Sequence, residues 1–266
     1  MIESPFSLRL LRQKIARIER DRPAAATACC ATGHAGIDQA LGGGLARGRL
    51  HELFAAEPED AASAAGFATM LAHRLGGGVV WLREEQAARL GGVMFAPGLV
   101  DIGLDPVRLI LGVLPDALAV LRAAADVVRC PEVGVGVIEL WRRSPLFDLA
   151  ASRRLALAAE ASGVTILLAR IAAEPVPSAA QTRWAVRSAP SLPLEANAPG
   201  HPAFEVELLR QRGGTAGGIW QVEWNRDEAV FRDRSEGKPA LSGAVVPLPA
   251  GRPADAGDVI PLCRAG

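Results

Sequence analysis

The chain has 266 residues, half of them apolar and 22% charged, a composition that excludes a wholly disordered protein and allows one domain with a tail. Lysine plus arginine and aspartate plus glutamate each number 29, so the protein has no global basic field for nucleic acid, and any contact with DNA requires a local patch. Only Lys14 and Lys238 are lysines, which leaves two candidates for chemistry that needs a lysine amine.

The cysteines do not predict a disulfide framework, because they are few for a chain of this size and two of them are neighbours. They are Cys29, Cys30, Cys130 and Cys263. No apolar run approaches the roughly 18 to 20 residues of a membrane-spanning helix. Basic residues also interrupt the apolar residues near the N-terminus, where a secretory signal would stand (Arg9, Arg12, Lys14). We therefore expect a cytoplasmic protein without a membrane segment.

The first 27 residues are predicted to form an amphipathic helix and a linker. Apolar residues recur there at spacings of three, four and three, which gives one apolar stripe on a helix. They are Leu8, Leu11, Ile15 and Ile18. The stripe can dock on the chain's own domain or on a partner chain, and the second reading makes these four residues candidate partner contacts. Pro23 and an alanine run separate the helix from the rest of the chain.

Residues 28–232 are predicted to form one α/β domain. Short apolar runs alternate with helical segments of 12 to 20 residues, which is typical of a parallel sheet with helices on its faces. The predicted strands are 50–54, 79–82, 133–140 and 164–169, and the predicted helices include 118–128 and a helix that Ser144 and Pro145 cap and that runs to Gly163.

Later segments read as antiparallel strands. Residues 204–210 and 219–224 alternate apolar and polar side chains around a glycine-rich turn, which predicts a C-terminal hairpin. Residues 182–187 also have strand character, and 228–232 can add an edge strand. Residues 233–266 are rich in proline, glycine and alanine, and we interpret them as a tail of low order.

The loop after the 50–54 strand lacks what a phosphate-binding loop requires. Such a loop wraps phosphates with backbone N–H groups of glycines, a lysine and a Ser/Thr hydroxyl. Residues 55–63 have no glycine or lysine, and instead carry Glu57, Glu59 and Asp60. Each missing charge-assisted contact forfeits about 1.5 to 3 kcal/mol, and acids near phosphate add repulsion. The sequence therefore predicts neither a bound triphosphate nor a cofactor here.

The residues before this loop resemble the lead-in to the phosphate loop of RecA-type recombinases. The resemblance is carried by Thr32-Gly33, Ile37-Asp38 and the run from Leu41-Gly42-Gly43-Gly44 to Glu52-Leu53-Phe54. By spacing from Phe54, Ala61 and Ala62 fall where the family has its lysine and hydroxyl. Glu85 matches the water-activating glutamate, and Glu139 matches the Walker B aspartate. Each can equally be an ordinary acid at a strand end.

Among RecA-like proteins the chain resembles the ImuA family, which lacks the ATPase loop. Two later segments are similar to that family: 182–186, and 208–214 with 220–224 after it. The resemblance covers about residues 1–232. It implies a non-catalytic adaptor in SOS-induced translesion mutagenesis, with a RecA-like core. The implied partners are ImuB (an inactive Y-family polymerase homologue), an error-prone DnaE-type polymerase and RecA.

Further constellations have a functional and a packing interpretation. Arg183 and Trp184 come after the 164–169 strand, where RecA-type proteins place a DNA-contacting loop, so they can contact a partner or single-stranded DNA, or pack in the core. Trp220 and Trp224 share one side of a strand and form a packed face or a binding edge. Arg210 and Arg212 likewise share a side, with solvation as the alternative.

No metal or catalytic triad is predicted. The set Cys29, Cys30 and His34 is too small for tetrahedral zinc, and no nucleophile elbow exists for a hydrolase. His51, within a strand, reads as packed or hydrogen-bonded. Two alternative functions remain: a SulA-like inhibitor of cell division that binds FtsZ, and a RecA-type ATPase with an atypical nucleotide loop.

Overall fold

The computed structural model describes residues 28–194, 198, 200–214 and 217–234. The predicted helix with Leu8, Leu11, Ile15 and Ile18, its linker, and the tail from residue 235 onward lie outside the described residues.

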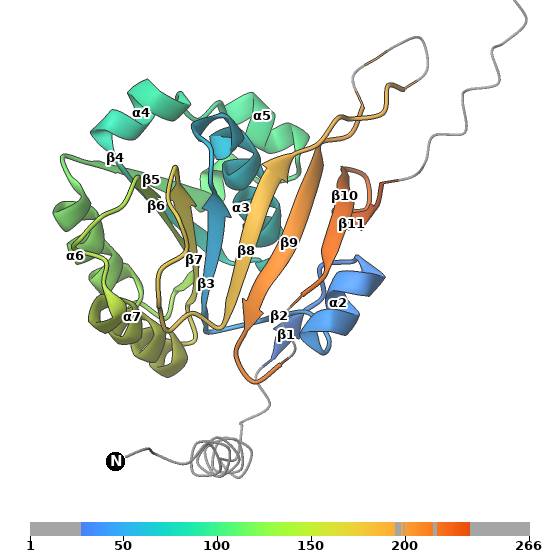
Figure 1. Ribbon diagram of the computed structural model, residues 1–266. Helices are drawn as coiled ribbons and strands as arrows, with labels where there is room; N and C mark the ends of the chain where they lie inside the picture. The colour runs from blue at the N-terminus through green and yellow to red at the C-terminus, as the bar shows by residue number, and fades with distance from the viewer. Residues whose placement is uncertain (1–27, 195–197, 199, 215–216, 235–266) are drawn as a thin grey trace, which may run out of the picture. The chain divides into compact units, whose positions relative to one another are not determined.

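A nine-stranded sheet organises the described chain, in the order β11-β10-β9-β8-β3-β7-β6-β4-β5 (Figure 1). The six strands from β8 to β5 are parallel, and β9, β10 and β11 continue the sheet in antiparallel fashion. The bounds are β3 Leu50–Ala55, β4 Gly78–Glu84, β5 Leu109–Leu114, β6 Val133–Trp141, β7 Thr165–Ile171, β8 Thr182–Ser188, β9 Ala203–Gln211, β10 Ile219–Asn225 and β11 Val230–Asp233. The predicted parallel sheet and C-terminal hairpin are confirmed.

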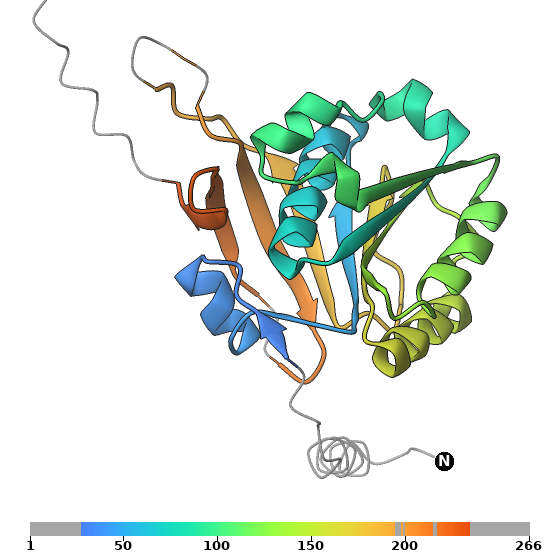
Figure 2. The same cartoon turned by 180° about the vertical axis from the view of Figure 1, so that it is seen from behind.

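Helices cover both faces of the sheet (Figures 1 and 2). The bounds are α2 Ala35–Leu41, α3 Ala61–Leu75, α4 Glu85–Gly91, α5 Ala96–Asp101, α6 Ala117–Val127 and α7 Leu149–Ser162, with short 3-10 turns at Pro58–Asp60 and Pro106–Arg108. Alternate residues of β3, β4, β6 and β7 enter two separate cores. Leu53 and Leu167 pack on the α3 side, whereas Leu50 and Ile166 pack on the side of α6 and α7. Strand β5 and helices α4 and α5 were not predicted.

The helix after β6 begins later than the sequence predicts. Ser144 and Pro145 were expected to cap it, but α7 begins at Leu149. The Asp148 carboxylate accepts the backbone N–H of Ala151 at 2.7 Å and so satisfies one of the free donors of the first turn. The residues between Trp141 and Asp148 are therefore loop.

The glycine-rich lead-in has a structural role in this fold. Asp38 Oδ1 accepts both the backbone N–H and the hydroxyl of Thr32, at 2.7 and 2.8 Å, and Oδ2 accepts the N–H of Gly33. Gly42 then ends α2 with a φ of 74°, a conformation that suits glycine. The chain continues to β2 (Leu45–Ala46), which pairs with β1 (Cys29–Cys30).

His51 is packed and hydrogen-bonded, as the sequence suggested. Trp184 Nε1 donates to the hydroxyl of Thr182, and that oxygen lies 2.7 Å from His51 Nδ1. His51 Nε2 lies 2.8 Å from the carbonyl of Ala46, which can only accept, so Nε2 donates. Complete burial lowers the pKa of His51 to about 4. The imidazole is therefore neutral at neutral pH and ties β3 to β8.

Candidate functional site at the carboxyl ends of the parallel strands

The loop between β3 and α3 is short and is held against the sheet. It makes a 3-10 turn over Pro58–Asp60 and enters α3 at Ala61. Glu57 and Glu59 are exposed on this turn. The carboxylate of Asp60 accepts the backbone N–H of Ser188 at 2.7 Å, which fastens the loop to the end of β8. This acid of the loop therefore has a structural role, because it holds the loop against β8.

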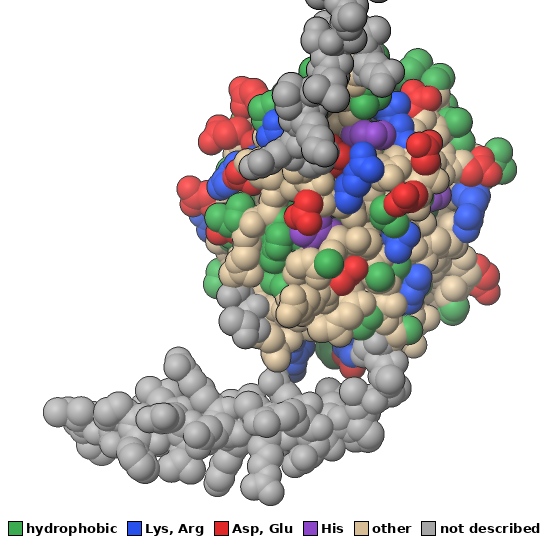
Figure 3. Space-filling view, turned by 90° about the vertical axis from the view of Figure 1, so that its right-hand side faces the viewer, with side chains coloured by type: hydrophobic (Ala, Val, Ile, Leu, Met, Phe, Trp, Pro, Cys, Tyr) green, Lys and Arg blue, Asp and Glu red, His purple; other side chains and the backbone are tan. Residues whose placement is uncertain are grey.

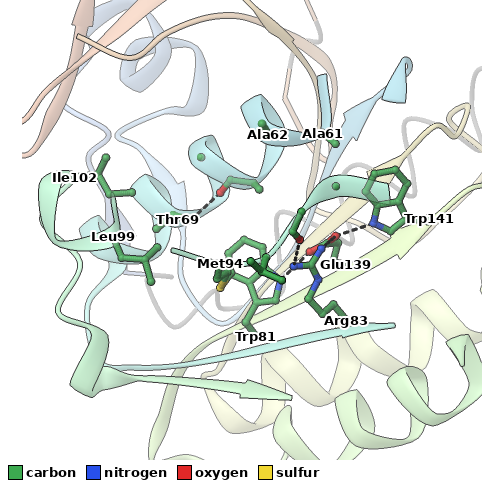
Figure 4. Close-up of a pocket in the computed structure, with 15 residues that line it drawn as sticks. Ala61, Ala62, Thr69, Trp81, Arg83, Met94, Leu99, Ile102, Glu139 and Trp141 are labelled. Atoms are coloured by element: carbon green, nitrogen blue, oxygen red, sulfur yellow. Dashed lines mark hydrogen bonds and ion pairs between the residues drawn. The ribbon is translucent and has the colours of Figure 1, made fainter. Parts of the chain in front are cut away.

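A cavity of about 220 Å³ lies beside the start of α3 (Figure 4). Its walls come from α3, from the ends of β4 and β6, and from the segment that runs from α4 into α5. The lining residues include Ala61, Ala62, Thr69, Trp81, Arg83, Met94, Leu99, Ile102, Glu139 and Trp141. Ligand pockets for small molecules are usually about 300 to 1,000 Å³, so this space is small for a nucleotide.

Glu139 is held at the wall of this cavity by three donors. Trp81 Nε1 donates to Oε2 at 3.0 Å, and Trp141 Nε1 donates to Oε1 at 2.7 Å. Arg83 Nη2 donates to the same Oε1 at 3.0 Å and forms an ion pair in which both side chains are 6% exposed. Arg83 also donates to the carbonyl of Gly92. The carboxylate that matches the Walker B position is therefore buried, paired and nearly saturated with hydrogen bonds.

The arrangement is poorly suited to a metal ion. A carboxylate that binds magnesium directs its lone pairs at the ion, and here three donors occupy them. The guanidinium of Arg83 would also repel a cation next to Glu139. Within the described ranges, no group of three or more metal-ligating side chains comes together.

The structure does not bring Glu85 to the cavity. Glu85 is exposed at the first position of α4 and is absent from the cavity wall. Its neighbour Glu84 ends β4, is buried, and accepts the side-chain amide of Gln86 at 2.7 Å. The two acids proposed from the sequence as remnants of an ATPase site, Glu85 and Glu139, thus have different environments.

Arg183 belongs to a buried cluster beneath the loop after β7. It lies in β8 rather than in a loop, is 8% exposed, and pairs with Glu52 of β3 at 2.9 Å. The hydroxyl of Ser178 donates a hydrogen bond to Glu52 and accepts one from Arg183. Burial raises the pKa of Glu52, while Ser178, Arg183 and Arg170 oppose that shift.

Arg170 of β7 completes the cluster. It is fully buried, and its guanidinium lies over the rings of Phe54 and Phe147, at 5.9 and 5.1 Å from their centroids. Sequence reasoning missed this group, because only the strand order β8-β3-β7 makes Arg183, Glu52 and Arg170 neighbours. The signal available in the sequence was Glu52 itself, an acid in the middle of a predicted strand.

The tryptophans pack in the core on the α3 side. Trp184 is 2% exposed and lies 6.5 Å from Phe67, ring centre to ring centre. Trp224 is fully buried and donates to the carbonyl of Ile102. Trp220 is half-buried against the same core and lies 6.2 Å from Trp184. The side that Trp220 and Trp224 share is thus a packed face.

The two arginines near the hairpin turn are both exposed. Arg210 lies in β9 and its Nη1 donates to the carbonyl of Ser178. Arg212 lies beyond the end of β9, and its backbone N–H donates to the carbonyl of Gln181. Arg212 is therefore in the turn and not on the strand side where Arg210 stands.

Restoring the two missing side chains is not expected to create an ATPase. In the variant A61K/A62T, the new side chains would stand at the cavity wall, where Glu139 would remain bound by Arg83 and two indoles. The loop before them would still lack the glycines that wrap phosphates. We expect ATP turnover equal to that of the unmodified chain in a phosphate-release assay with Mg²⁺. Robust turnover in the variant alone would show that the rest of a nucleotide site is intact.

The chain is similar to a named bacterial protein and to a solved recombinase structure, although no family model matches it. The protein named ImuA from two strains of Caulobacter vibrioides, NA1000 / CB15N and ATCC 19089 / CB 15, is 36% identical over 194 residues. That match covers 66% of this chain and 75% of the relative. The crystal structure of the RadB recombinase matches with a TM-score of 0.53 at 17% identity, over 77% of this chain and 99% of that one.

The structural match confirms the predicted RecA-like fold. Within the part of the chain that the structure describes, no helix has the length and apolar character needed to cross a membrane.

Proposed function

Because the chain belongs to the ImuA family, we propose that it is a non-catalytic adaptor in DNA-damage-induced mutagenesis. In this role the RecA-like core supports protein interfaces during translesion synthesis in the cytoplasm. The proposed partners are an ImuB-type Y-family polymerase homologue, an error-prone DnaE-type polymerase and RecA, with single-stranded DNA as a weak ligand and no role for a membrane.

The environment of Glu139 carries the proposal. In a working ATPase of this fold, the acid at the end of this strand has to serve the metal and the nucleotide. Here it accepts hydrogen bonds from Trp81, Trp141 and Arg83. Together with a loop that lacks glycine and lysine, this supports a core that no longer turns over nucleotide.

A binding panel on one purified sample of the full chain tests the adaptor role. ImuB and RecA are offered as separate baits in pull-down experiments, with single-stranded DNA and Mg-ATP as further ligands. We expect capture of ImuB or RecA and no thermal shift with ATP. A ligand present at 100 times its dissociation constant stabilises by about 2.7 kcal/mol, so ATP binding would be visible. Binding to neither protein would end the proposal.

The apolar stripe of the N-terminal segment is the proposed partner contact. The variant L11D/I15D puts two charges on that stripe, so we expect it to lose ImuB or RecA in the same pull-down while its circular dichroism is unchanged. The matched control is R12D/R17D, which changes charges in the same segment off the stripe. Retained capture by L11D/I15D would move the contact to another surface.

The two alternative functions are not favoured. The 36% identity to ImuA supports the mutagenesis role over a SulA-like inhibitor of FtsZ. Cell filamentation on overexpression, without an effect on mutation frequency, would reverse that preference. ATP turnover by the unmodified chain would favour the RecA-type ATPase.

A further inference from the structure

Strand β5 is an exposed and unprotected edge of the sheet. It pairs with β4 on one side and with no other strand of the described residues (Figures 1 and 2). Leu109 and Leu114 pack against the two cores, but three large apolar side chains between them are open to solvent, on both faces of the strand: Ile110 is 67% exposed, Leu111 41% and Val113 50%. Leu109–Leu114 contains no charged residue and no proline. An edge of this kind is a template for pairing with another strand.

The opposite edge of the same sheet is protected in the usual way. Strand β11 carries Arg232 and Asp233, which pair with Glu223 at 2.7 Å and with His34 at 2.8 Å. Figure 3 faces this side of the molecule and shows acidic and basic side chains interspersed over it. The two edges therefore differ in the feature that blocks strand addition.

We propose that β5 is the interface of a homodimer, in which β5 strands of two copies pair in antiparallel fashion across a twofold axis. The sheets of the two copies then become one continuous sheet. A twofold interface uses the same patch on both copies, so every contact occurs twice. Because β5 exposes apolar side chains on both faces, a strand that is apolar on both faces would bury them best, and a second copy of β5 is such a strand.

Backbone geometry restricts the register of this pair. Alternate residues of β5 direct their N–H and C=O groups to β4, and the remaining residues direct theirs to the free edge. Residues that lie opposite each other must both direct these groups to the partner, or both direct them away. In two copies of one strand, opposite residues therefore have numbers that are both odd or both even. The two most central registers place the axis at Leu111 or at Gly112.

Charge selects the register centred on Gly112. It sets Arg108, the last residue of the 3-10 turn before β5, opposite Asp116 of the second copy, the N-cap of α6 two residues after β5, and does so at both ends of the interface. Both residues are exposed, and Arg108 makes no side-chain hydrogen bond or ion pair within the described residues. Asp116 uses Oδ1 to accept the N–H of Ala119 at 2.8 Å, which leaves its second oxygen for a guanidinium. The register centred on Leu111 would instead leave Arg108 opposite Leu114.

Sedimentation equilibrium of the full chain across the micromolar range tests the dimer. We expect a reversible dimer for the unmodified protein and a dissociation constant raised at least about tenfold in I110K, because a charge must then be buried at the interface. The matched control is I219K, which places the same change on a side chain of similar exposure (61%) in β10. We expect I219K to dimerise like the unmodified chain.

A charge exchange tests the register. In R108D alone, or in D116R alone, both ends of the homodimer carry like charges, and we expect each to dimerise at least about tenfold more weakly. An equimolar mixture of R108D and D116R restores an opposite pair at each end, so we expect a heterodimer as tight as the unmodified dimer. Because D116R loses the cap of α6, circular dichroism is used to check that it is folded.

Three results would contradict this assembly. A monomeric unmodified protein, or dimerisation of I110K equal to that of I219K, would overturn the proposal and, in the second case, place self-association on another surface. Weak R108D with no rescue by D116R would overturn the register centred on Gly112. These measurements use the protein alone, so they are independent of whether ImuB or RecA is captured.

Discussion

Replacing Glu139 with alanine is expected to lower the free energy of unfolding by about 3 to 5 kcal/mol, the range for breaking a buried ion pair by removing one partner. Arg83 would keep its charge in the interior without a counter-charge, and the indole N–H groups of Trp81 and Trp141 would lose their acceptor. Urea denaturation followed by circular dichroism measures the loss. The expectation depends on the three contacts and not on any nucleotide chemistry.

Glu85 supplies the matched control. It was the other acid placed in a former ATPase site by sequence, and it is exposed and absent from the cavity wall. Glu85 is an acid in the first turn of α4, where a carboxylate interacts favourably with the helix dipole, so we expect E85A to lose at most about 0.3 to 1 kcal/mol. Equal stabilities for E139A and E85A would contradict the structural role assigned to Glu139.

Replacing Glu52 with alanine is expected to cost a similar amount, about 3 to 5 kcal/mol. The variant leaves two interior guanidinium groups, Arg170 and Arg183, without the carboxylate that lies 2.9 Å from Arg183. Ser178 also loses the acceptor of its hydroxyl. Thermal and urea denaturation measure the effect, and E52Q should lose less, because the amide still accepts a hydrogen bond.

An exposed ion pair between β8 and β9 is the control for burial. Arg187 and Glu205 lie 3.0 Å apart, with exposed fractions of 49% and 31%. Surface ion pairs usually contribute about 0 to 1 kcal/mol, so E205A should be close to the unmodified chain. Equal losses of unfolding free energy in E52A and E205A would contradict the conclusion that burial makes the Glu52 ion pair important for stability.

Local sequence patterns predicted the elements that depend on local chemistry. The predicted strands 50–54, 79–82, 133–140 and 164–169 correspond to β3, β4, β6 and β7, and alternation around a glycine-rich turn corresponds to β9 and β10. A short segment that is mostly apolar and is bounded by turn residues is typical of a strand, so these predictions needed no knowledge of neighbours. Strand β5 was missed, although Leu109–Leu114 is such a segment.

The candidate site could be located but not described from sequence. Spacing placed Ala61, Ala62 and Glu139 near one another, and all three line the cavity. The donors around Glu139 could not be inferred, because Trp81 and Arg83 lie more than 50 residues earlier and meet Glu139 only through the pairing of β4 with β6. The sequence likewise could not show that Arg183 pairs with Glu52, because that pairing depends on β8 lying next to β3. Arg183 was therefore interpreted as a candidate partner or DNA contact.

Composition and local order thus sufficed for the class of fold, for the absence of a glycine-lysine phosphate loop, and for the resemblance to ImuA. Strand order decided which charged side chains are buried together, which acid accepts hydrogen bonds from two indoles, and which edge strand of the sheet is left exposed. The physical reason is range: backbone preference and apolar periodicity act over a few residues, whereas a buried ion pair is defined by neighbours that only the assembled sheet brings into contact.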